Sequence, residues 1–178
     1  MIYLVLAFLS AIALEIFYAK KLGLRVYTFE ATASHFTMGI GQQVLNLFSL
    51  SALVAAYVAL YDHFRIFEWD ASDWRVWVGL IVVADFCFYV AHRLCHRSNF
   101  FIGAHVVHHQ AEDFNHGSAL RQSWTSRPVM FLFYAPLAVL GVSVQMLMGC
   151  LLANLFVQFF SHNGVVRRKL GILEYVLV

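Results

Sequence analysis

The sequence predicts an all-α, polytopic membrane protein, and three observations lead to that prediction. Of the 178 residues, 61% are hydrophobic and only 12% are charged, and the mean hydropathy of +0.71 is too high for a soluble domain of this length. The apolar residues are gathered into long runs, and a helix needs about 20 such residues to cross a bilayer. Because a chain inside lipid must satisfy its own backbone hydrogen bonds, these runs are expected to be helical.

The first apolar run covers residues 2–19 and carries a single charge, Glu15. No basic residue precedes the run, whereas Lys20 and Lys21 follow it, which does not fit a cleaved signal peptide. Positive residues next to a span stay on the cytoplasmic side. The run therefore predicts an uncleaved anchor whose N-terminus lies outside.

Two further runs predict two more spanning helices. Residues 36–61 carry no charge, and residues 76–91 carry only Asp85. The more polar residues around them predict a short link over 22–34 and an outer loop over 62–74, whose tryptophans suit a membrane interface. The sequence therefore predicts about three spanning helices before the last apolar run.

The last apolar run, residues 128–161, carries no charge and is too long for one span. As a single helix it would extend about 50 Å, whereas the hydrocarbon core is about 30 Å thick. The run has a natural break from Pro136 to Gly141, which predicts a helical hairpin that enters and leaves the membrane on one side. That geometry would return His162 to the face where other histidines lie.

The basic residues predict the orientation of these spans. Of the 12 lysines and arginines, all but Arg65 and Arg75 fall on one side if the spans alternate. By the positive-inside rule this side, which includes a polar excursion over residues 92–127, is cytoplasmic. We therefore expect an integral, multi-pass protein of a bacterial inner membrane or the endoplasmic reticulum, with its histidine cluster on the cytoplasmic face. Topology explains the net charge of +2, so no nucleic-acid partner is expected.

Five of the nine histidines lie within the eighteen residues from His92 to His109. Their spacing is i, i+4 in a first set and i, i+3, i+4 in a second, so on helices each set shares one face. Neutral imidazole is the commonest metal ligand among side chains. The two sets, with one more histidine from the hairpin, predict a site for one or two metal ions. The expected ligands are His92, His96, His105, His108, His109 and His162.

Polar side chains continue the same helical faces. Asp85 lies two turns before His92, and a carboxylate within a span needs a partner. We therefore expect Asp85 to accept a hydrogen bond from a ligand imidazole and to orient it. On the return arm of the hairpin, Asn154 and Gln158 precede His162 at helical spacing, and for these amides a role at the metal and hydrogen bonding between helices are equally good interpretations. No role is assigned to His35, His63 or His116.

The chain resembles the fatty acid hydroxylase/sterol desaturase superfamily of integral-membrane enzymes over roughly residues 80–178. The segments HRLCH (92–96) and HVVHH (105–109) match its first two histidine boxes, and QFFSH (158–162) matches a further helical histidine. Within the superfamily, the segments AEDFNHGSALRQS (111–123) and LGILEYVLV (170–178) resemble the alkylglycerol monooxygenase branch and its bacterial relatives.

The resemblance implies a non-haem di-iron enzyme that uses O2 to hydroxylate or desaturate a lipid alkyl chain or a sterol. It implies two iron ions, with zinc as a substitute, held by the six histidines above, and it implies that Asp85 orients a first-box imidazole. Electrons would come from a separate reductase, ferredoxin, cytochrome or pterin. Residues 1–178 are expected to form one membrane domain, with membrane helices in 1–75 and the histidine boxes in 76–178.

Two features depart from the pattern of the superfamily. There, the LGILE segment leads into a last HxxHH box, which would follow Val178. We therefore expect three more ligands beyond this residue, and we expect a chain that ends here to lack full activity. In addition, Arg97 stands where the alkylglycerol monooxygenases carry a glutamate just after the first box, which weakens the expectation of tetrahydrobiopterin-dependent ether cleavage.

Two other classes of function compete with this interpretation. A metal transporter would place histidines and acids near the middle of the bilayer on broken helices, whereas the HVVHH triplet is expected at the membrane face. A haem-binding cytochrome needs single axial histidines on facing helices, and clustered histidines do not fit it. The alternative kept is a membrane transporter for zinc or iron, or a metal-binding protein without oxygenase activity.

Overall fold

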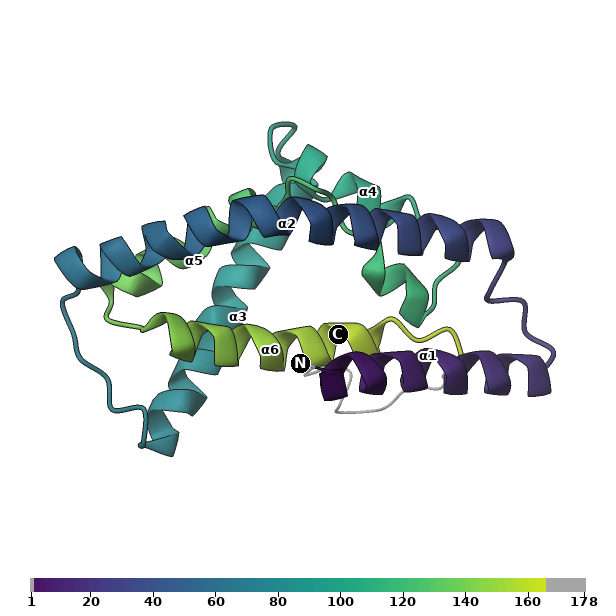
Figure 1. The fold of residues 1–178 in the computed structure, drawn as a ribbon, viewed down its shortest axis with the longest axis horizontal. Coiled ribbons are helices and arrows are strands. Elements are labelled where there is room, and N and C mark those ends of the chain that lie inside the picture. Colours follow the sequence, from purple (N-terminus) through teal and green to yellow (C-terminus); the bar gives the residue numbers. More distant parts are fainter. Residues whose placement is uncertain (1, 166–178) are drawn as a thin grey trace. The chain divides into compact units, whose positions relative to one another are not determined.

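The computed structural model describes residues 2–165, and every regular element among them is a helix (Figure 1). The predicted all-α fold is therefore confirmed. The elements, in chain order, are α1 (Ile2–Lys21), α2 (Phe29–Phe64), α3 (Trp74–Arg97), the 3-10 helix η1 (Ile102–Ala104), α4 (Val106–His109), the 3-10 helix η2 (His116–Leu120), α5 (Ser126–Val139) and α6 (Val144–Ser161).

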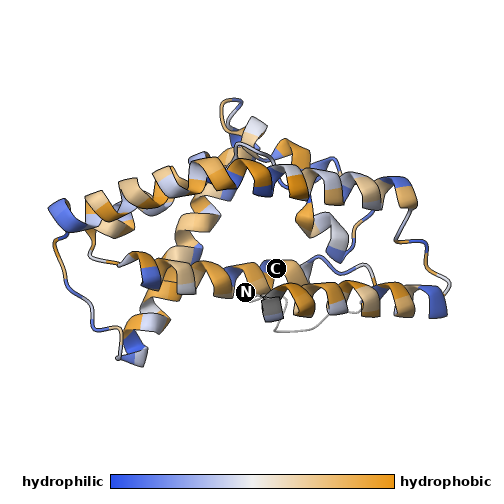
Figure 2. Ribbon diagram, in the orientation of Figure 1, coloured by the Kyte–Doolittle hydropathy of each residue, from blue (hydrophilic) through white to orange (hydrophobic). Residues whose placement is uncertain are grey.

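Three of the described helices, α2, α3 and α6, are long and apolar enough to cross a membrane. Figure 2 shows hydrophobic residues along these helices, with hydrophilic residues gathered near helix ends and in the connecting segments. Helix α5 is apolar but shorter, at 14 residues. These features agree with the predicted polytopic membrane protein. The anchor expected over residues 2–19 coincides with α1, and its passage through a membrane stays a prediction.

The link predicted over residues 22–34 is shorter in the structure, because α2 already begins at Phe29. Before this helix, the Thr28 hydroxyl accepts a hydrogen bond from the Ala31 amide, with oxygen and nitrogen 3.2 Å apart. The amide and hydroxyl of Thr28 in turn donate to the carboxylate of Asp113, at 3.0 Å each. Side chains of this kind satisfy the free amides at a helix start, and apolar periodicity does not reveal them.

The predicted break in the last apolar run is confirmed, although its position differs slightly. Helix α5 ends at Val139, and α6 begins at Val144 and runs back in roughly the opposite direction (Figure 1). Pro136 lies inside α5 and does not end it. The chain turns at Gly141, whose φ of +86° falls in the left-handed region that favours glycine.

The chain divides into two compact units. The first unit comprises residues up to 40, residues 107–122 and residues from 156 on, and the second unit comprises residues 41–106 and 123–155. Helices α2, α4 and α6 contribute residues to both units. Each unit thus combines segments that are distant in the sequence. The expectation that residues 1–75 and 76–178 are two parts of one domain stays a prediction.

The core of the second unit joins α2, α3, α5 and the start of α6. The Tyr57 hydroxyl donates to the Val142 carbonyl at 2.9 Å, so the polar group of this buried ring is satisfied. Gly149 on α6 lies so close to the Trp77 ring that a Cβ there would come within 2.7 Å, and the absence of a side chain brings α6 next to α3. The buried core residues are Tyr57, Leu80, Ala84, Tyr134, Leu137, Ala138, Val142, Met146, Leu147 and Cys150.

The first unit packs α1 and the connection after it against the segment around η2. Asn115 caps η2: its Oδ1 accepts from the Ser118 amide at 3.0 Å, and the Ser118 hydroxyl accepts from the Asn115 amide at 3.4 Å. The Asn115 side chain also donates to the Val26 carbonyl. Because these groups are buried, their hydrogen bonds hold η2 close to the connection after α1.

Candidate metal centre

Helix α3 carries the first two histidines in its last two turns. The helix starts where the Asp73 side chain accepts a hydrogen bond from the Arg75 amide at 2.9 Å, and it extends to Arg97. His92 and His96 are one turn apart within this continuous helix, so their rings lie on the same face, in agreement with the helical spacing of the first histidine box.

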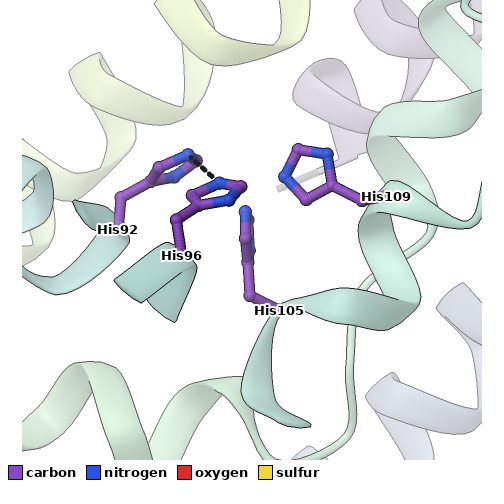
Figure 3. A group of neighbouring side chains, drawn as sticks. All are labelled: His92, His96, His105 and His109. Carbon is purple, nitrogen blue, oxygen red and sulfur yellow. Dashed lines mark hydrogen bonds between the residues drawn. The ribbon is translucent and has the colours of Figure 1, made fainter. Parts of the chain in front are cut away.

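Three imidazoles of the second unit, from His92, His96 and His105, form what we call the three-imidazole group. One ring nitrogen of each lies within 4.8 Å of those of the other two. The centroid of the His105 ring is 4.4 Å from that of His92 and 4.9 Å from that of His96. Figure 3 shows these rings turned toward one another, and it also draws His109, which ends α4 and belongs to the first unit.

The geometry of the three-imidazole group suits a metal ion. Two nitrogens bound to one ion at about 2.1 Å lie about 3.0–3.4 Å apart, for angles of about 90–109°, and the Nε2 atoms of His92 and His96 are separated by 3.0 Å. His105 is buried, with 8% of its surface exposed, whereas His96 is exposed, so an ion could reach the group from outside. An all-imidazole donor set is compatible with iron, zinc, copper and nickel.

The second histidine box is not carried by one continuous helix, which differs from the helical spacing expected for it. His105 ends η1 with φ −138° and ψ −27°, outside helical geometry, and α4 supplies only the residues Val106–His109. His105 belongs to the second unit, as His92 and His96 do, and His108 and His109 belong to the first unit. The spacing i, i+3, i+4 could not reveal the break, because it is compatible with a continuous helix.

In the first unit, His108 and His162 form a second group, which we call the imidazole pair. Their Nε2 atoms are 3.0 Å apart, and their ring centroids are 5.0 Å apart. Nδ1 of His108 is 2.9 Å from the carbonyl oxygen of Arg121. Nδ1 of His162 is 2.6 Å from the carbonyl oxygen of Gln158, so this contact is made by the backbone of Gln158.

These hydrogen bonds determine where the protons of the imidazole pair lie. A carbonyl oxygen only accepts, so each Nδ1 carries a hydrogen, and each neutral ring keeps a lone pair on Nε2. Two Nε2 atoms 3.0 Å apart can share a proton in a hydrogen bond, and a metal ion can take the place of that proton. Ligating histidines commonly donate their other N–H to a carbonyl oxygen, and the imidazole pair therefore also fits a metal ion.

Asp85 has a partner on another helix. Asn154 on α6 donates from Nδ2 to Oδ1 of Asp85 at 2.9 Å. The hydroxyl of Tyr89, one turn after Asp85, accepts from Arg93 at 2.8 Å. Hydrogen bonding between helices is therefore confirmed for Asn154, and the role of Asp85 toward a ligand imidazole stays a prediction.

Because Asp85 and Asn154 join α3 to α6 inside the second unit, we expect Asp85→Ala to lower the free energy of unfolding by about 1 kcal/mol, a typical size for hydrogen bonds between membrane helices. The measurement is denaturant unfolding in detergent of Asp85→Ala, Asn154→Ala and the double variant. If the two side chains act through each other, the double variant is scarcely less stable than either single one. Additive losses would contradict this pairing.

Sequence reasoning gave no role to Glu15 and His116, which the structure brings together in the first unit. Oε2 of Glu15 lies 2.8 Å from Nδ1 of His116, and both side chains are buried. One signal was present in the sequence, because an ionisable residue inside an apolar run usually has a polar partner. That partner is 101 residues away along the chain, and no local spacing identifies it.

Comparison with known proteins agrees with the histidine pattern. A family model of fatty acid hydroxylases matches residues 77–178, a range that includes every predicted ligand. The chain is 34% identical over 141 residues to alkylglycerol monooxygenase of Homo sapiens, 35% identical over 132 residues to that of Xenopus tropicalis, and 35% identical over 147 residues to that of Danio rerio.

These matches cover 78%, 70% and 78% of this chain, but only 31%, 27% and 31% of the relatives. The chain thus spans about a third of the length of the curated relatives it matches. No solved structure matches the chain. The segment LGILEYVLV (170–178) and the basic residues Arg167, Arg168 and Lys169, which entered the sequence analysis, lie outside the described residues.

Proposed function

Since this chain belongs to the fatty acid hydroxylase family, we propose that it is a membrane-bound, iron-dependent oxygenase, or part of one, that hydroxylates or desaturates an alkyl chain of a lipid. The apolar helices α2, α3 and α6 support a membrane setting, in which such a substrate is dissolved. The names of the relatives make alkylglycerols the substrate class to test first.

One observation carries this proposal, namely the two groups of imidazoles whose nitrogens are spaced for metal ions. The three-imidazole group would hold one iron ion and the imidazole pair a second. His109, four residues after His105, would add a further ligand, and zinc would bind the same nitrogens as a substitute. Iron bound there would supply the activation of O2 and the oxidation of a C–H bond.

The chain's own groups would orient the ligands and limit the access of water. The carbonyl oxygens of Arg121 and Gln158 hold the two rings of the imidazole pair with Nε2 available to a metal. Beside the three-imidazole group, the Phe88 ring centroid is 5.4 Å from that of His92, which gives this histidine an apolar neighbour. Asp85, two turns before His92, would help to orient the same ring.

The partners of the reaction follow from the same proposal. Electrons would come from a separate reductase, ferredoxin, cytochrome or pterin. The excess of basic residues on one side of the expected spans supports a cytoplasmic position for the histidines, and a donor would then approach from the cytoplasm.

A metal transporter is the alternative class of function. Transporter sites lie near the middle of the bilayer, on helices that are broken there. In this chain His92 and His96 lie in the last two turns of α3, a continuous helix of 24 residues. A position at the end of a helix supports a site at the membrane surface, where an oxygenase can meet both lipid and electron donor.

Iron binding and lipid oxidation test the proposal together. We expect the chain, purified in detergent and incubated with Fe(II) without oxygen, to retain iron through gel filtration. With O2, a reductant and an alkylglycerol, we expect slow formation of an oxidised lipid, detectable by mass spectrometry, because the last HxxHH box of the superfamily would follow Val178. The matched control is the variant with His92, His96 and His105 all replaced by alanine. A folded chain that retains neither iron nor zinc would contradict the proposal, and metal flux into proteoliposomes without lipid oxidation would favour the transporter.

A further inference from the structure

A buried carboxylate gathers three distant segments of the first unit. Oε2 of Glu15, on α1, accepts from the Tyr27 hydroxyl at 2.5 Å and from the His116 amide at 2.8 Å. Oε1 accepts from the Gly164 amide at 2.7 Å. Nδ1 of His116 is also 2.8 Å from Oε2, at ion-pair distance but without the alignment of a hydrogen bond. One carboxylate thus holds the connection after α1, the start of η2 and the segment after α6.

Burial explains why these groups stay together. Glu15 is 4% exposed, and a buried carboxylate without hydrogen-bond donors is strongly disfavoured. Burial raises the pKa of the Tyr27 phenol, and the hydrogen bond to Glu15 raises this pKa further, so the phenol keeps its proton and donates at neutral pH. Removing any donor would leave part of an enclosed charge unsatisfied, which keeps the three segments close to α1.

Two of these segments belong to the imidazole pair. Gly164, whose amide binds Glu15, is two residues after His162. The ring of His116 packs against that of Phe159, three residues before His162, with centroids 4.8 Å apart. The segment that contains His116, residues 107–122, also contains His108. Glu15 therefore binds one segment that contains His108 and another that follows His162.

We propose that Glu15 is a positioning residue for the imidazole pair. Its carboxylate holds the end of α6 and residues 107–122 in the arrangement that keeps Nε2 of His108 and Nε2 of His162 within reach of one metal ion. The inference rests on the proposed function, because it assumes that the pair binds metal. Glu15 acts through His116 and Gly164, not as a ligand.

Glu15→Gln is the informative variant, because it keeps the size of the side chain. A carboxylate accepts hydrogen bonds on both oxygens, whereas an amide accepts on its oxygen and donates from its nitrogen. The new amide nitrogen would face another donor. This donor would be either the Gly164 amide or, at the position of Oε2, the Tyr27 hydroxyl and the His116 amide. One of the bound segments should therefore move away and carry one histidine of the pair with it.

The test is a titration of the full chain in detergent with Co(II), whose absorption bands report the number and geometry of nitrogen ligands. We expect the three-imidazole group to bind Co(II) tightly and the imidazole pair to bind it more weakly. His162→Ala should remove the weaker class of sites. Glu15→Gln should weaken the second class about 10–100-fold, as the loss of a group that orients a ligand does, and leave the bands of the first class unchanged. Glu30→Gln, at an exposed glutamate of α2, is the matched control and should change neither class.

The outcomes separate this inference from the proposed function. If His162→Ala removes the weaker class and Glu15→Gln does not change it, the role of Glu15 is wrong and the metal site stands. If His162→Ala changes nothing, the pair binds no metal, which overturns both the second metal site and the role of Glu15.

A second variant is needed if Glu15→Gln fails to fold. Misfolding would be recognised by an equal loss of both classes of Co(II) sites and by a loss of the circular dichroism signal of helices. Tyr27→Phe removes one donor and keeps the carboxylate. A weaker second class in this variant, with the first class unchanged, supports the positioning role, and unchanged binding of both classes overturns it.

Discussion

Replacing His105 with alanine is expected to weaken metal binding to the three-imidazole group by more than about 100-fold, because it removes a ligand, whereas losing a group that only orients a ligand costs about 10–100-fold. His105 is the buried member of the group, and its ring lies beside those of both His92 and His96. Without it, the group keeps only His92 and His96, which are neighbours on one helix. Titration with Co(II), together with metal analysis of the purified variant, measures the change.

The backbone around His105 should tolerate this substitution. The His105 amide donates to the carbonyl of Ile102 at 2.9 Å, and alanine keeps that bond. His63→Ala is the matched control, because His63 is exposed at the end of α2 in the same unit and should not alter metal affinity. Wild-type affinity in a folded His105→Ala protein would show that the three-imidazole group is not a metal site.

Most of the fold could be predicted because lipid leaves the backbone few alternatives. Apolar runs of sufficient length must be helical in a membrane, and α3 and the hairpin of α5 and α6 follow that rule. The start of α2 could not be predicted in the same way. It depends on Thr28 and Asp113, which are 85 residues apart in the chain and meet only after folding.

The candidate site, like the fold, could be predicted only in part. His92 and His96 share one face because a single helix carries both, and helical spacing is enough to predict this. The contact of His108 with His162 joins residues 54 positions apart, and a returning hairpin predicts only that they share a membrane face. Which imidazoles meet depends on the break at His105, which belongs to a connection of short helical turns with no periodicity of its own.

Replacing Gly141 with alanine is expected to destabilise the second unit by at least about 2 kcal/mol, from two separate causes. A side chain at a φ of +86° costs about 1–2 kcal/mol. A Cβ at this position would also overlap the carbonyl oxygen of Phe67, and overpacking adds about 1–3 kcal/mol. The carbonyl cannot easily move aside, because the adjacent Ile66 amide donates to the Val139 carbonyl at 2.8 Å and the Trp69 indole donates to the Leu140 carbonyl at 2.7 Å.

Gly79→Ala is the matched control, because it adds the same methyl group to α3 at a point where no atom lies within 4 Å of the new Cβ. A glycine inside a helix is about 0.5–1 kcal/mol less favourable than alanine, so this variant should be more stable than the unchanged protein. Denaturant unfolding in detergent, followed by tryptophan fluorescence, compares the two variants within one unit. If Gly141→Ala unfolds at the same denaturant concentration as Gly79→Ala, the loop of residues 65–69 does not confine the turn, and another contact must hold α5 against α6.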